Sequence, residues 1–156
     1  MKKSKFLLAH YRRDERIVDL VERTDHKVLA NWAIDCAERV LPYFEAQFPD
    51  DSRPRNAIKT LRDWIDTGVF SMKIIRKASL DSHASAREVG KDNAARSAAR
   101  AAGQAVATAH VPTHSIGSAI YALQAIHRAT DFSDADNAVA KERDRQYRRL
   151  LSLRMK

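Results

Sequence analysis

Hydrophobic residues recur at intervals of three and four along most of this 156-residue chain. This spacing places apolar side chains on one face of an α-helix, whereas strands alternate with a period of two, a pattern that the sequence lacks. The pattern predicts an all-α protein, built as a helical bundle or short helical array of about seven helices. At this length, a single domain over residues 1–156 can bury a core without disulfides.

Proline, glycine and capping residues set the expected helix ends. Pro54 fits the first turn of a helix. Gly68 can end a helix, because glycine readily adopts the left-handed backbone conformation. Pro42 lies inside an apolar stripe, and we expect it to kink or end that helix, because proline removes a backbone donor. The predicted helices cover residues 14–22, 25 to about 42, 54 to about 67, 71 to about 89, 93 to about 110, 113–128 and 135–153.

Residues 94–109 contain nine alanines. Alanine is the best helix former and lets neighbouring backbones approach closely. The polar residues Arg96, Arg100, Gln104 and Thr108 recur every four positions and therefore form one stripe. We expect a central helix whose alanine faces pack in the core and whose polar stripe is exposed to solvent.

The formal net charge of +8 lies at the two ends of the chain. Residues 1–16 hold six basic and two acidic side chains, residues 141–156 hold seven and two, and the middle holds 15 and 16. Basic ends bind nucleic acid or another polyanion through phosphate contacts, or they are solvated and aid solubility. The lack of interleaved aromatic residues favours the solvated interpretation.

The single cysteine, Cys36, excludes an intramolecular disulfide and suits a reducing compartment. The apolar run at 6–9 is too short for the core of a signal peptide, and no run of eighteen apolar residues could cross a membrane. We therefore expect a cytoplasmic protein without membrane contact.

His110 and His114 are candidate metal ligands, because two histidines four residues apart on one helix can share a zinc ion. Pro112 is expected to place them on different helices, and no glutamate lies between them as in zinc proteases. We expect no metal and no cofactor, with both imidazoles bonded to backbone groups at the helix break. A metal site at these histidines is the weaker alternative. Its third ligand would come from Asp35, Cys36 or His83.

Cys36 is also a candidate nucleophile, since nearby positive charge activates a thiolate. It falls on an apolar stripe with Trp32 and Val40, however, so we expect a buried and unreactive thiol. Asp35 is spaced to pair with Arg39 at i+4 on the same helix. Glycine-rich phosphate loops, nucleophile elbows and CxxC pairs are all missing from the sequence, so we expect no catalytic residues.

Three segments carry a family resemblance: residues 35–41 (DCAxRVL), 54–58 (PRxAI) with Trp64, and 98–111 (AARAAGQAVATAHV) with the following His114 and residues 119–122. Together they resemble the Imm-five-like group of immunity proteins from bacterial polymorphic toxin systems. The similarity covers roughly residues 28–126 and leaves both ends outside. It implies an all-helical, non-enzymatic protein that binds and neutralises a toxin delivered between bacteria.

Within this resemblance, the structural motif residues are Asp35, Arg39, Pro54, Trp64, His110 and His114. Because arginines and an amide can bind a partner's carboxylates, the candidate partner-binding residues are Arg55, Arg96, Arg100 and Gln104. Immunity proteins against nucleases are commonly acidic, so the charge of +8 indicates an acidic or near-neutral toxin, or a chiefly apolar contact. The alternative function is nucleic-acid or polyanion binding through the basic termini. The lean apolar helices also permit a homodimer.

Overall fold

The computed structural model describes residues 14–156, and every regular element within them is an α-helix. The predicted all-α class is therefore confirmed. Of the basic N-terminal segment 1–16, all but the last three residues lie outside the described part. The seven helices are α2 (Glu15–Glu22), α3 (His26–Glu45), α4 (Arg53–Thr67), α5 (Met72–Glu88), α6 (Ala94–Ala107), α7 (His114–Ala129) and α8 (Ala135–Arg154).

Local signals in the sequence set most of the helix ends. The side chains of Asp14, Ser71 and Asn93 accept backbone N–H groups in the first turns of α2, α5 and α6. Gly68 ends α4 in the left-handed region, with a φ of 70°. The expectation that Pro42 could end the second helix is wrong, because α3 continues through it to Glu45. Proline removes the bond that its own N–H would donate, but the following turn still forms, since the Ala46 N–H donates to the Pro42 carbonyl at 3.0 Å.

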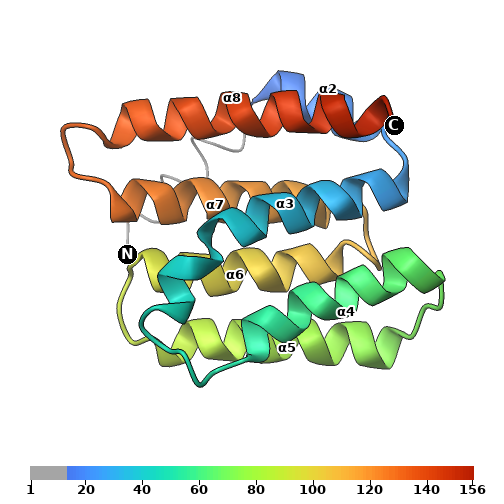
Figure 1. Ribbon diagram of the computed structural model, residues 1–156, viewed down its shortest axis with the longest axis horizontal. Helices are drawn as coiled ribbons and strands as arrows, with labels where there is room; N and C mark the ends of the chain where they lie inside the picture. The colour runs from blue at the N-terminus through green and yellow to red at the C-terminus, as the bar shows by residue number, and fades with distance from the viewer. Residues whose placement is uncertain (1–13) are drawn as a thin grey trace.

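The helices are arranged around α6, which packs against α3, α4, α5 and α7. In Figure 1, α8 and α2 run along one side of the molecule, and α4 and α5 run along the opposite side. Between them lie α3, α7 and the central α6. Among the helices of residues 14–156, none is long and apolar enough to span a bilayer.

Six of the eight alanines of α6 are fully buried, in agreement with the prediction: Ala95, Ala98, Ala99, Ala101, Ala102 and Ala105. The expected solvent-exposed stripe on the same helix is wrong. Thr108 is completely buried, and Arg100 and Gln104 are only partly exposed. Four helices pack against α6, so Arg100 and Gln104 bond to His83 of α5 and His114 of α7 where these helices meet.

Candidate partner-binding site

An open pocket of about 180 Å³ lies where α5, α6 and α7 meet. Helix α5 forms one wall, α6 forms the floor, and the α6–α7 connection and the start of α7 form the other wall. We call it the α5 pocket. Its lining residues are Met72, Ile75, Arg76, Ser79, Leu80, His83, Gln104, Ala107, His110 and His114.

Two hydrogen bonds fix the polar groups at the base of the α5 pocket. The Arg100 guanidinium donates to Nδ1 of His83 at 2.9 Å, so this nitrogen is an acceptor. Nδ1 of His114 lies 2.8 Å from Oε1 of Gln104, which can only accept, so this nitrogen donates. Burial and the neighbouring Arg100 lower the pKa of His83 to about 4. Burial, together with His110, also lowers the pKa of His114. The His83 imidazole is therefore neutral near pH 7.

Two glycines make room for these polar side chains. A Cβ at Gly103 would lie 2.7 Å from Nε2 of His83, and a Cβ at Gly117 would lie 2.6 Å from Oε1 of Gln104. Both contacts are too close for real carbon atoms, so any larger residue would displace the ring or the amide. Glycine within a helix costs roughly 0.5–1 kcal/mol relative to alanine. At Gly103 and Gly117 this cost allows the close approach of His83 and Gln104.

The outer rim of the α5 pocket carries several exposed apolar side chains. Leu80 is 54% exposed, and Met72 from the first turn of α5 is also exposed. The ring of Phe70 stacks on His110, with their centroids 6.2 Å apart. The neighbouring Ile74 side chain on α5 is likewise open to solvent. Grouped apolar side chains of this kind on a folded surface are typical of interaction sites.

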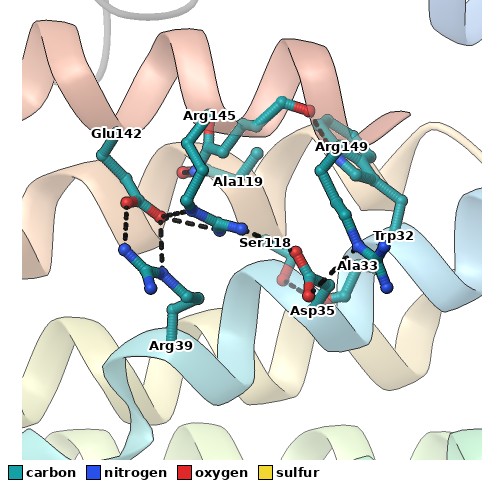
Figure 2. A network of polar contacts seen from close by, with 10 residues as sticks. Trp32, Ala33, Asp35, Arg39, Ser118, Ala119, Glu142, Arg145 and Arg149 are labelled. Carbon is teal, nitrogen blue, oxygen red and sulfur yellow. Dashed lines mark hydrogen bonds and ion pairs between the residues drawn. The ribbon is translucent and has the colours of Figure 1, made fainter. Parts of the chain in front are cut away.

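A second polar cluster joins α3 to α8 (Figure 2). Glu142 is only 4% exposed and accepts hydrogen bonds from Arg39, at 2.8 Å and 3.3 Å, and from Arg145, at 2.8 Å and 2.9 Å. Asp35 pairs with Arg145 at 2.9 Å and with Arg149 at 3.5 Å. The expected pair between Asp35 and Arg39 is therefore wrong. Asp35 and Arg39 each pair instead with an oppositely charged side chain of α8, so the charges of α3 join it to α8.

Hydrogen bonds from side chains to backbone carbonyls also connect α3, α7 and α8 to one another. The Trp32 indole donates to the Gln146 carbonyl at 2.9 Å, and the Gln146 amide donates to the Ala119 carbonyl at 3.1 Å. The Ser118 hydroxyl donates to the Ala33 carbonyl at 3.1 Å. The basic C-terminal residues 141–156 therefore belong mostly to a docked helix, not to a free solvated end.

Comparison with family models shows where the chain belongs. A model described as "Imm-5 like putative immunity protein" matches residues 19–153. The chain belongs to this family. The match extends beyond the residues 28–126 of the sequence resemblance and includes the end of α2 and nearly all of α8. Comparison with curated proteins and with solved structures finds no match to this chain.

The structure of this immunity-family chain brings together two of the four candidate partner-binding residues. Gln104 lines the α5 pocket and Arg100 lies behind His83. Arg96 is one turn away, where it pairs with Asp92 at 2.7 Å. Arg55 lies on α4 and pairs with two carboxylates of α3, those of Glu45 at 2.7 Å and Glu38 at 3.3 Å.

Both histidines of the sequence pattern line the α5 pocket. Their separation by Pro112 was expected, whereas their ring contacts differ from the prediction. Pro112 separates them, with His110 in the α6–α7 connection and His114 at the start of α7. Their rings do not complete the helix ends as backbone partners, because His114 bonds to the Gln104 amide and His110 stacks on Phe70. Within residues 14–156, no group of three His, Cys, Asp or Glu side chains could hold a metal ion.

The remaining motif residues are structural. Pro54 is buried in the first turn of α4, as predicted, and the Trp64 ring packs 4.7 Å from that of His26. Cys36 is completely buried, which confirms its predicted place in the core. Burial raises the pKa of its thiol well above the usual value, and the carboxylate of Asp35 adds to this effect.

Sequence reasoning missed the exposed apolar side chains of α5. Ile74 and Leu80 resemble core residues in composition, and only the packing of α5 against α4 and α6 shows which face is left open. A weak signal was present, because Ile74 and Ile75 are adjacent and one helix face cannot bury both.

Proposed function

We propose that this protein is an immunity protein that binds a bacterial protein toxin and neutralises it without catalysing a reaction. The observation that carries the proposal is the match of the immunity-protein family to residues 19–153. The toxin belongs to a polymorphic toxin system in this proposal, and the immunity protein meets it in the cytoplasm. A lone reduced thiol at Cys36 suits that compartment.

The chemistry of the described residues supports binding over catalysis. Cys36 is the candidate nucleophile of the sequence, yet its thiol is buried and its pKa is raised, both of which oppose thiolate formation. His83 and His114 are held by Arg100 and Gln104 in fixed hydrogen bonds, as expected for side chains that shape a surface. The exposed apolar rim beside them offers contact area to a partner.

Polyanion binding through the basic termini has less support. Arg145 and Arg149 contribute to the basic C-terminal count, but both pair with Asp35, and Arg145 also pairs with Glu142. When an arginine pairs with a carboxylate, its positive charge is partly compensated, which weakens its attraction for a phosphate. Together with Arg143, which lies 3.8 Å from a carboxylate oxygen of Asp14, three of the seven basic side chains in residues 141–156 are thus already paired with carboxylates.

Co-expression tests the proposed function. The candidate toxin is the protein encoded by the neighbouring gene, which is expressed from an inducible promoter in a bacterial host, alone or together with this protein. We expect the toxin to stop growth alone, and co-expression to restore growth and yield a stable complex on gel filtration. An immunity protein from an unrelated toxin system serves as the control. Continued growth arrest beside abundant, folded protein would contradict the proposal.

A further inference from the structure

We propose that the α5 pocket is the docking site for the toxin, and that it receives a segment in which an apolar side chain lies next to a carboxylate. This inference rests on the proposed function and adds the location and the chemistry of the contact. Its two parts, the carboxylate and the apolar side chain, come from different features of the pocket.

The carboxylate follows from the charges of the lining. Every ionisable side chain among the described residues that line the α5 pocket is basic, and none is an aspartate or glutamate. Arg76 on the rim is exposed, and within residues 14–156 no acidic side chain forms an ion pair with it. The adjacent Lys77, in contrast, is already paired with Asp81 at 2.6 Å. A partner carboxylate would therefore find an available guanidinium at the rim of the pocket.

A second positive charge, that of Arg100, lies behind His83 of the pocket lining. Arg100 is partly buried and donates to His83, and no described carboxylate forms an ion pair with it. Burial lowers the pKa of this guanidinium, although far too little for the cation to lose its proton. Arg96, one turn earlier on α6, has the carboxylate of Asp92 as a partner. The base of the α5 pocket thus keeps an uncompensated positive charge, which favours an anionic group in the partner.

The apolar side chain follows from the walls and the size of the pocket. Met72, Ile75 and Leu80 contribute hydrocarbon surface to it, with Ala107 on the floor. Its volume of about 180 Å³ is several times the roughly 30 Å³ that one water occupies in the liquid. Buried anchor side chains that fill such pockets carry most of the binding energy of protein interfaces. The exposed rim formed by Phe70 and Leu80 would surround this anchor.

Two substitutions in the pocket and two matched controls test the proposal. Arg76→Glu reverses the charge on the rim, and Leu80→Asp places a charge on its apolar wall. Arg148→Glu and Phe132→Asp make the same kinds of change on the opposite side of the molecule, on α8 and in the loop before it. Phe132 is 91% exposed, and Arg148 is also exposed. All four variants should keep the circular dichroism spectrum and melting behaviour of the parent protein.

The readout is the Kd for the purified toxin domain of the rescue experiment, measured by calorimetry at low and high salt. We expect each pocket variant to raise Kd by roughly 10-fold to 100-fold, and each control to change it by less than about threefold. The effect of Arg76→Glu should shrink as salt rises, because salt screens exposed charges, whereas the effect of Leu80→Asp should remain.

Each other outcome has a distinct meaning. If the toxin binds the parent protein and all four variants equally, the docking site is elsewhere and the inference is wrong, while the immunity function stands. Larger effects of Arg148→Glu or Phe132→Asp would place the interface near α8 and would also overturn it. If Leu80→Asp converts a dimer to a monomer without changing toxin affinity, the pocket binds a second copy of this chain instead. Failure of the parent protein to bind the toxin would refute the proposed function itself.

Discussion

Replacing Glu142 by alanine removes a nearly buried carboxylate that connects α8 to α3. Its two oxygens accept four hydrogen bonds, two from Arg39 and two from Arg145. The pKa of Glu142 is lowered by these two arginines, although burial by itself would raise it. The carboxylate is therefore ionised at neutral pH, and its loss removes two charge-assisted contacts.

The expected loss of stability is about 2 kcal/mol. Arg39 is 51% exposed, so water screens its pair with Glu142, and this contact contributes at most about 1 kcal/mol. Arg145 is 25% exposed, and hydrogen bonds to charged groups contribute about 1.5–3 kcal/mol. The lower end of that range applies, because Arg145 keeps its bond to Asp35 at 2.9 Å. For a chain of this size, a loss of about 2 kcal/mol corresponds to a decrease in Tm of roughly 4–8 °C.

Urea unfolding followed by circular dichroism measures this difference. Asp144→Ala is the matched control, since this carboxylate lies on the same helix and pairs with Arg16 at 3.1 Å, but both side chains are more than half exposed. We expect the control to lose less than about 0.5 kcal/mol. Glu142→Gln, which keeps the shape and an acceptor, should lie between the two. Equal losses for Glu142→Ala and Asp144→Ala would refute the argument, because burial would then not determine the strength of the contact.

Three further predictions concern single groups. Hydrogen bonds from Arg53, above all, lower the pKa of Asp51 to about 2, so the stability that this ionised carboxylate adds is present above pH 4 and is lost between about pH 4 and pH 2. Asp51→Asn should flatten the pH dependence of the urea midpoint in that window, and an unchanged slope would contradict this cause. The thiol of Cys36 should react with Ellman's reagent only as fast as the protein unfolds, and immediate labelling would show that it is accessible. Gly103→Ala should cost about 1 kcal/mol and shift the imidazole NMR signals of His83, and a second change, His83→Ala, should remove most of that cost. A fully stable Gly103→Ala variant with unshifted signals would contradict the proposed close contact.

The helix ends were predictable from the sequence because caps, prolines and glycines act locally. Asn93 caps α6 and Gly68 ends α4 whatever packs around them. Proline can either kink or end a helix, and the sequence alone left both outcomes open for Pro42; in the fold, α3 continues to Glu45 and buries Leu41 and Phe44 on either side of the proline. Periodicity likewise groups the residues that share a face, but it does not reveal what covers that face. Thr108 therefore belongs to the predicted stripe and is nevertheless buried.

Long-range partners were beyond the reach of the sequence. The i+4 rule paired Asp35 with Arg39 because it considers only one helix. In the folded protein, Arg39 meets Glu142, a residue 103 positions away. The α5 pocket has the same origin, because residues from three helices and one connection meet only after α5 and α7 pack on α6. Its histidines and Gln104 were singled out by type, whereas their arrangement around one cavity depends on the fold.

The central alanine-rich helix α6 and the outer helix α5 differ in how freely their residues can be substituted. Helix α6 contacts four neighbours through side chains that cannot grow without overpacking, so its sequence has little freedom to change. The outer face of α5 has no such restriction, since residues such as Leu80 and Arg76 contribute little to the core. If the toxin binds the α5 pocket as proposed, a lineage could alter which toxin it resists by substitutions on α5 while the scaffold beneath stays intact. Diversification of specificity would then cost almost no folding stability.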